Sequence, residues 1–234
     1  MKTKFIHSLI ALTLVSMVAA GITVSRGARS HSGTSPTAGQ ERPKSLREQA
    51  MERDVEVPGL EEYSEYYEYS DFKELAKNPN AIVYGRIIER NSYFDDSGLP
   101  FEHGRIIMTQ YTVEVLRVLK DRTQEMMIAP NTPLPAPLKT PLKITRNGGV
   151  VYVNGHRASM KVKGFEDINP GQDYIFFLFW SSAYKTYSLA GNISGVMAVN
   201  YDLTLRSLAS ADELKTKVQG MTLESLIREL RTII

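Results

Sequence analysis

Asp173-Tyr-Ile-Phe-Phe-Leu-Phe-Trp180 is the stretch of sequence that decides the fold of this chain. All seven residues that follow Asp173 are aliphatic or aromatic. A short, continuous apolar run bounded by turn residues is typical of a strand that is buried on both faces. We therefore expect residues 173–180 to form a strand in the core of a β-rich domain.

Further strands are predicted on both sides of this segment, because β-branched and aromatic residues gather in runs that are bounded by turn residues. The pair Asn154-Gly155 is a strong hairpin signal, since both residues accept positive φ. Residues 184–190 are expected to pair with 173–180 through a Ser-Ser-Ala turn. The predicted strands are Ala81–Tyr93, Arg105–Lys120, Leu142–Arg146, Val150–Val153, His156–Val162, Tyr184–Ala190, and one or two within Gly195–Leu205.

The second predicted strand changes phase along its length. Tyr111, Val113 and Val115 alternate with polar residues, and then Leu116 and Val118 continue on the opposite phase. A one-residue bulge shifts a strand by one position and bends it. We expect such a bulge near Val115 and Leu116, returning the apolar residues to the core of a small barrel.

Helices are predicted before and after the strands. Residues 71–77 read as a short helix that ends before Pro79. Ser210 and Glu213 form a capping box for a penultimate helix, and Gly220 is placed to end it. Thr222 is expected to cap the last helix, whose stripe should cover the sheet. That stripe consists of Leu223, Leu226, Ile227, Leu230 and Ile234.

A segment before these elements interleaves four tyrosines with four glutamates between Glu61 and Ser70. We expect residues 59–78 to form an acidic, tyrosine-rich helical lead-in that lays its rings on the barrel. Two alternatives are tyrosine modification in a eukaryotic secretory host and partner binding. The tyrosines assigned to partner binding are Tyr63, Tyr66, Tyr67 and Tyr69.

Residues 1–24 read as an export segment. A basic start (Lys2, Lys4) is followed by an apolar segment, which is the pattern of a secretory signal. Cleavage is expected after Ala20. An uncleaved anchor is the alternative, because about 20 helical residues cross a bilayer, and only residues 5–24 would then contact the membrane. Either outcome predicts a secreted, periplasmic or cell-envelope protein.

Residues 25–58 are rich in Ser, Gly, Thr, Pro and charge, and we expect them to form a disordered spacer. The β-barrel domain is then predicted at 79–208, and the C-terminal helices that pack on it at 209–234.

Composition excludes several classes of protein. The chain has no cysteine, which excludes disulfides, thiolate metal sites and a lipid-modified cysteine. It has 28 Lys and Arg against 26 Asp and Glu, and loss of Lys2 and Lys4 leaves 26 of each. A nucleic-acid partner is therefore not expected, because such binding depends on clustered basic residues.

No residues are assigned to catalysis, a cofactor or a metal. The nearest approach to a catalytic motif is Gly191-Asn-Ile-Ser194-Gly195, in which the first glycine is one position too far for a nucleophile elbow. We expect its glycines to serve a tight strand connection. The alternative is a metal-independent hydrolase that uses Ser194 with His156 or His103.

Two phrases of the sequence support a family resemblance. Tyr111-Thr-Val-Glu-Val-Leu-Arg-Val-Leu-Lys120, followed by Asn169-Pro-Gly-Gln-Asp-Tyr-Ile-Phe-Phe-Leu178, resembles the netrin-like module and the inhibitory domain of tissue inhibitors of metalloproteinases. The resemblance covers about residues 80–200 and implies an OB-type barrel. Inhibitors of that family chelate the protease zinc through an N-terminal cysteine, which this chain lacks.

We therefore predict a mostly β fold with flanking helices, an OB-like small barrel behind an export segment and a flexible spacer. The expected function is a binding module of the cell envelope or exterior with a protein or glycan ligand.

Overall fold

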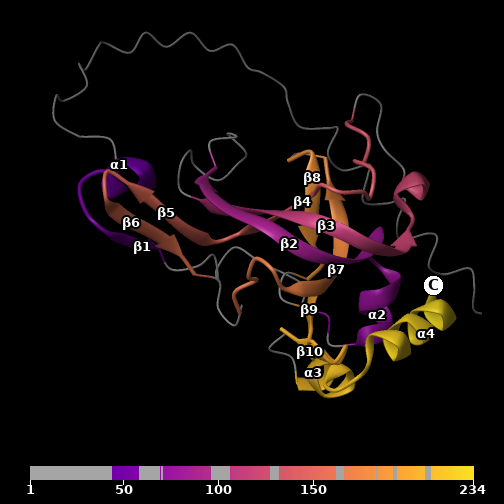
Figure 1. Cartoon of the computed structure of the whole chain (residues 1–234). Coiled ribbons are helices and arrows are strands. Elements are labelled where there is room, and N and C mark those ends of the chain that lie inside the picture. Colours follow the sequence, from indigo (N-terminus) through magenta and orange to yellow (C-terminus); the bar gives the residue numbers. More distant parts are fainter. Residues whose placement is uncertain are drawn as a thin grey trace, which may run out of the picture. The chain divides into compact units, whose positions relative to one another are not determined.

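Strands dominate the computed structural model of this chain (Figure 1). The structure describes residues 44–57, 69, 71–95, 106–126, 132–161, 166–182, 184–191, 194–208 and 212–234. These residues fall within one unit, Pro43–Ile234. The predicted fold class, mostly β with a few helices, is confirmed.

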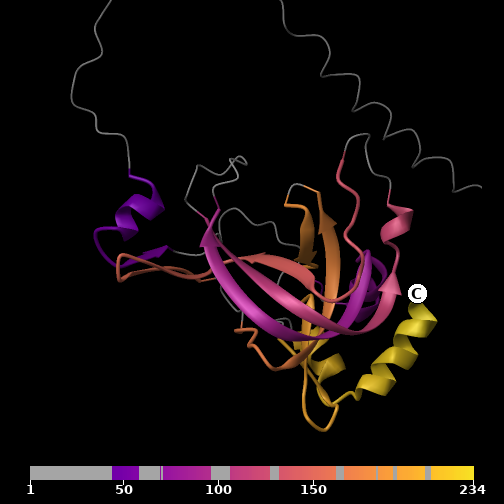
Figure 2. The same ribbon diagram turned by 45° about the horizontal axis from the view of Figure 1, so that its top comes forward.

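Seven strands form one sheet in the order β10-β9-β7-β2-β3-β4-β8. β8 also pairs with β7, so β7, β2, β3, β4 and β8 close into a ring of five strands (Figure 2). All pairs in the ring are antiparallel except β4 with β8, which is parallel. The strands are β2 (Ala81–Phe94), β3 (Ile107–Asp121), β4 (Leu142–Asn147), β7 (Asp173–Ser181), β8 (Thr186–Leu189), β9 (Val196–Val199) and β10 (Leu205–Ser207).

β7 is the central strand, as the apolar run predicts. Residues Ile175–Leu178 are fully buried. One edge of β7 pairs with β2, and the other edge is divided between β9 and β8. The division falls at Phe177, whose N–H donates to the Gly195 carbonyl at 2.9 Å and whose carbonyl accepts from the Ala190 N–H at 2.8 Å. The expected strand connection at Gly191–Gly195 thus lies where β8 and β9 separate.

A second, three-stranded sheet has the order β1-β6-β5. It consists of β1 (Val55–Val57), β5 (Gly149–Val153) and β6 (His156–Met160), and it lies at one end of the β2–β3 pair (Figures 1 and 2). The predicted hairpin is confirmed, because Asn154 and Gly155 have φ of 52° and 86° and connect the antiparallel β5 and β6.

The spacer prediction is wrong for the residues next to this sheet. Helix α1 (Leu46–Ala50) begins with a capping box between Ser45 and Glu48, and β1 pairs in parallel with β6. Leu46 and Ala50 are buried in a second apolar cluster that includes Phe94 and Met160. This segment is ordered by tertiary contacts, because a five-residue helix is too short to be stable alone. The rest of the predicted spacer, 25–43 and 58, lies outside the described residues.

The predicted bulge is present, but its expected consequence is wrong. Tyr84 and Gly85 of β2 pair with Arg117 and Val115, which leaves Leu116 as the extra residue of β3. Leu116 and Val118 are nevertheless 42% and 40% exposed. Two further register shifts, at Leu119 and Ile88, add to the bending of this strand pair. Leu119 packs against the core, but Leu116 and Val118 do not return to it.

Gly85 sits at the tightest point of this bend. A Cβ atom there would lie 2.6 Å from Val113 Cγ1 and 2.7 Å from the Glu114 carbonyl oxygen. Only glycine lets the two bulged backbones approach this closely.

The helices cover the ring on one side (Figures 1 and 2). Thr222 caps the last of these helices, as predicted, Asp71 caps the first, and Leu223, Leu226 and Leu230 are buried. Ile227 and Ile234 pack partly buried against the same core. The predicted cap at Ser210 lies outside the described residues. The elements are α2 (Phe72–Lys77), η1 (Thr123–Glu125), α3 (Asp212–Val218) and α4 (Leu223–Ile233). Among the described residues, no helix is long and apolar enough to span a membrane.

One buried charge ties β3 to α2. The Lys120 side chain donates to the carbonyls of Ala76 and Lys77 at 2.9 and 2.6 Å, and the residue is only 5% exposed. These carbonyls belong to the last turn of α2 and have no partner within the helix. Burial, together with the nearby Arg122, lowers the pKa of Lys120 to about 8.

Replacing this lysine tests its role in stability. We expect Lys120→Met to destabilise the protein by about 1–3 kcal/mol at neutral pH, because two buried carbonyls lose their donor. In the unfolded chain the lysine titrates near 10.5 and in the folded chain near 8. The unfolded state therefore binds more protons between these values, and this group adds stability as pH rises through that window.

Urea unfolding from pH 7 to pH 10 measures both effects, with Lys143→Met on the exposed side of β4 as the control. The wild type should gain stability relative to Lys120→Met as pH rises. A pH-independent difference between the two proteins contradicts the titration.

Candidate functional site

A groove lies where the start of β7 meets the β9–β10 turn. It has a volume of about 640 Å³ and is lined by Arg86 of β2, residues 169–173 and residues 199–203. The two loops are distant in sequence, and the pairing of β7 with both β2 and β9 brings them together.

Asp173 is the centre of the polar network in this groove. Its Oδ2 accepts from the Tyr84 hydroxyl at 2.8 Å, and its two oxygens accept from Nε and Nη2 of Arg86 at 2.6 and 3.2 Å. The side chains lie at adjoining positions of the β2–β7 pair, in which Arg86 is opposite Asp173. A bidentate guanidinium–carboxylate pair holds both groups in one geometry.

The network changes the acidity of Tyr84. Burial and the hydrogen bond to the Asp173 carboxylate raise the pKa of Tyr84 to about 12. The same carboxylate raises the pKa of Arg86. Tyr84 and Arg86 therefore remain fully protonated at neutral pH, and Asp173 holds the guanidinium of Arg86, which lines the groove, in a fixed position.

The β9–β10 turn is held by its own hydrogen bonds. The Asn200 N–H donates to the Thr204 carbonyl, and the Leu203 N–H donates to the Asn200 carbonyl, both at 2.9 Å. Asp202 Oδ1 accepts from the Thr204 N–H and hydroxyl, which lowers the pKa of Asp202. The turn presents Tyr201 with its side chain fully exposed.

The turn is also fastened to the last helix. The Leu223 N–H donates to the Leu203 carbonyl at 2.8 Å, and Thr204 bridges to Thr222, the cap of α4. Leu203 takes a φ of 61° and is 48% exposed. A residue other than glycine is strained in the left-handed region and stays there only when its surroundings hold it. The exposed ring of Tyr201 is thus carried on an ordered loop.

The opposite wall of the groove is anchored to β2. The Gly171 N–H donates to the Ile87 carbonyl at 2.8 Å, and the Ile87 N–H donates to the Gln172 carbonyl at 3.2 Å. The buried Tyr174 hydroxyl accepts from the Asn169 N–H and donates to Gln172 Oε1, both at 2.9 Å. Gly171 has a φ of 81°, which glycine adopts without strain.

These groups are suited to recognition. Amide, carboxylate and guanidinium side chains offer planar hydrogen-bond donors and acceptors, and Tyr201 offers an exposed aromatic face. Within the described ranges, no group of three or more His, Asp and Glu side chains is placed to hold a metal ion. The groove therefore has the chemistry of a binding site for a polar ligand with an apolar face.

The tyrosines predicted to bind a partner are only partly described. Tyr69 is 6% exposed and belongs to the main core, where its N–H donates to Ser194 Oγ at 3.1 Å. Its ring packs inward, as the lead-in interpretation expects, and offers no surface to a partner in this structure. Tyr63, Tyr66 and Tyr67 lie outside the described residues, and their partner-binding role stays a prediction.

Ser194 has a structural position. It is fully buried, and its hydroxyl donates to the Gly191 carbonyl at 2.9 Å and accepts from Tyr69. His156 lies on β6 of the other sheet, where Nδ1 is 3.5 Å from Asp54 Oδ1. His103 lies outside the described residues. Ser194 thus has no imidazole beside it among the described residues.

Sequence reasoning missed the residues that line this groove. Asn169-Pro-Gly-Gln172 and Asn200-Tyr-Asp-Leu-Thr204 are turn sequences, and each is unremarkable alone. The available signal was a tyrosine inside a turn sequence, since binding residues concentrate on loops held by a rigid scaffold.

No protein-family model matches the chain, and no curated protein matches it. The site must therefore be interpreted from its own geometry.

The Tyr84–Asp173 hydrogen bond is testable by titration. We expect Asp173→Asn to lower the pKa of Tyr84 from about 12 toward its usual 10, because the carboxylate that favours the protonated phenol is removed. The wild type loses the stability contributed by this group as pH rises from 10 through 12. NMR of ¹³Cζ-labelled tyrosine follows the titration, and Tyr84→Phe assigns the signal.

Tyr187 provides the internal control. Burial raises its pKa to about 12, with a contribution from Asp121 and none from Asp173. The Tyr187 signal should be unchanged in Asp173→Asn. An unchanged Tyr84 signal would contradict the assigned hydrogen bond.

Proposed function

We propose that this protein is an exported binding module of the cell envelope or exterior, and that the groove between Arg86 and Tyr201 receives a glycan. The five-stranded ring is then an OB-like barrel. Three features support this assignment: a closed ring of five strands, a non-sequential strand order, and a groove formed by the segment that leads into β7 and by the β9–β10 turn beside the ring. OB barrels bind oligosaccharides and oligonucleotides through a sheet face and adjoining loops.

The observation that carries the glycan proposal is the exposed ring of Tyr201 beside fixed polar side chains. A sugar has one apolar face, which packs on an aromatic ring, and a rim of hydroxyls, which bond to planar polar groups. Asn169, Gln172 and Asn200 line the groove and supply amide groups of this kind. The charges of Arg86 and Asp173 offset each other, which favours an uncharged glycan over a charged polymer.

A protein ligand is the alternative for the same groove, since exposed tyrosine is also enriched at protein interfaces. A hydrolase that uses Ser194 is less well supported, because the hydroxyl of Ser194 is buried and bonded to backbone groups. The neutral mature charge continues to argue against nucleic acid.

The glycan proposal is tested by replacing the exposed ring. We expect Tyr201→Ala to weaken glycan binding at least about tenfold, in keeping with the loss of one stacked aromatic contact. The measurement is a screen on an array of neutral oligosaccharides, followed by calorimetric titration of the best ligand.

Tyr152→Ala is the matched control, because Tyr152 is 69% exposed but lies on β5 of the other sheet. The Tyr152→Ala variant should bind the glycan with the same affinity as the wild type. Equal loss in both variants, or no array signal for the wild type, would reject the glycan site. A protein captured by the wild type and lost with Tyr201→Ala would support the alternative.

The export proposal rests on residues 1–24, whose basic start and apolar run match a secretory signal. We expect mass spectrometry of the mature protein to find Gly21 as the first residue, in a fraction outside the cytoplasm. An intact N-terminus in the membrane fraction would favour the anchor instead. An intact N-terminus in the cytoplasm would reject export.

A further inference from the structure

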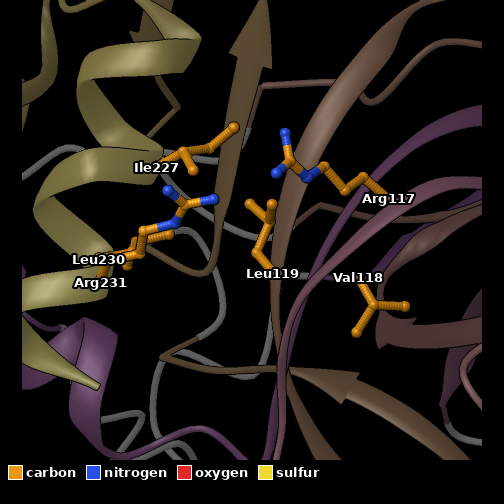
Figure 3. Close-up of a pocket in the computed structure, with 6 residues that line it drawn as sticks. All are labelled: Arg117, Val118, Leu119, Ile227, Leu230 and Arg231. Carbon is orange, nitrogen blue, oxygen red and sulfur yellow. The ribbon is translucent and has the colours of Figure 1, made fainter.

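A second hollow lies between β3 and α4, apart from the groove described above. It has a volume of about 140 Å³ and is lined by Arg117, Val118, Leu119, Ile227, Leu230 and Arg231. Figure 3 shows the side chains of Arg117 and Arg231 reaching toward each other from opposite walls, with Leu119 and Ile227 beside them. We call this hollow the arginine cleft.

The two arginines of the cleft lack acidic partners. Neither Arg117 nor Arg231 forms an ion pair or hydrogen bond with any residue in the described part of the chain. The neighbouring acid on α4, Glu229, is instead paired with Lys217 of α3 at 3.0 Å. Two guanidinium groups that converge over apolar walls repel each other, and an anion between them removes the repulsion and gains charge-assisted hydrogen bonds.

The strand beside the cleft has a free edge. β3 pairs with β4 only from Met108 to Val113, and the Val115 N–H donates to the Thr140 hydroxyl at 2.8 Å. From Leu116 to Lys120 the strand pairs with β2 alone, and its other edge has no backbone partner among the described residues. An unpaired strand edge is a template for an added strand.

Two bulges of β3 lie within the segment that has the free edge and also lines the arginine cleft. Leu116 and Leu119 are the extra residues of the two bulges in β3. Arg117 and Val118 lie between these bulges, so the bends change the direction of their side chains. Val118 is 40% exposed and Leu116 is 42% exposed. Leu116 and Val118 thus expose apolar side chains on the strand segment that has the free edge.

We propose that the arginine cleft binds an extended acidic peptide. One carboxylate of the peptide lies between Arg117 and Arg231, and its backbone pairs with the free edge at Leu116–Lys120. The cleft is too small for a sugar ring with its hydroxyls and suits a single acidic side chain. The strand edge beside it favours a peptide over a free anion, because only a peptide offers a complementary ladder.

A pair of synthetic peptides tests this proposal. The probe is acetyl-Glu-Val-Glu-Val-Glu-amide, and the control peptide replaces each Glu with Gln. Calorimetric titration at low salt should show binding of the Glu peptide and at least about tenfold weaker binding of the Gln peptide. NMR shifts should appear at the methyl groups of Leu119 and Ile227, and affinity should fall as salt is added.

Variants locate the carboxylate. Arg117→Gln and Arg231→Gln should each weaken the Glu peptide about tenfold. Both residues are exposed, so we expect both variants to fold, and the melting temperature checks this. Arg53→Gln is the matched control, since Arg53 is an exposed arginine outside the cleft. Equal binding of the two peptides, or unchanged binding in both cleft variants, overturns the proposal.

Two further measurements distinguish a peptide site from a simple anion site. Two further Glu peptides carry backbone N-methyl groups, one at the odd positions and the other at the even positions. Each peptide therefore lacks the N–H donors along one edge of the added strand. One of the two should lose binding, and retention by both overturns the proposal. Inorganic phosphate that displaces the peptide at equal concentration also overturns it.

Discussion

The structure depends on the way β7 shares one of its edges. Phe177 bonds to Gly195 through its N–H and to Ala190 through its carbonyl, so β8 leaves the strand at the residue where β9 begins to pair. A Cβ on Gly195 would lie 2.3 Å from the Ala190 carbonyl oxygen, and only glycine permits this approach. This division lets β8 close the ring while β9 and β10 extend from it, and the buried Ser194 hydroxyl ties the same connection to Tyr69.

Both proposed binding surfaces arise where strands depart from regular pairing. The groove forms at the start of β7, where β9 carries the Tyr201 turn to the side of Arg86 and Asp173. The arginine cleft forms where the bulges of β3 turn its outer half away from β4 and toward α4. The bulges of β3 and the division of β7 thus position the exposed residues of both surfaces.

The two surfaces also differ in charge in a way that the overall composition conceals. The chain as a whole has 28 basic and 26 acidic residues, so its overall charge is close to balanced. In the groove, Arg86 is offset by Asp173, and this local neutrality suits a glycan. In the cleft, Arg117 and Arg231 converge without an acid among the described residues, and this local excess suits a carboxylate. Binding is decided by the charge at each site, because exposed charges farther than a Debye length are screened.

The sequence by itself determined the strands, the hairpin at Asn154-Gly155, the cap at Thr222, and the bulge at Leu116, because periodicity, turn residues and caps act within a few positions. It did not predict α1 and β1, which are too short to form without Phe94 and β6. The exposure of Leu116 and Val118 was also not predicted, because apolar residues in a strand are expected to lie in the core. Only the tertiary structure decided the ring closure, the groove at Asp173 and the arginine cleft. Each of these features joins residues that are far apart in the chain, and local sequence patterns do not specify such long-range contacts.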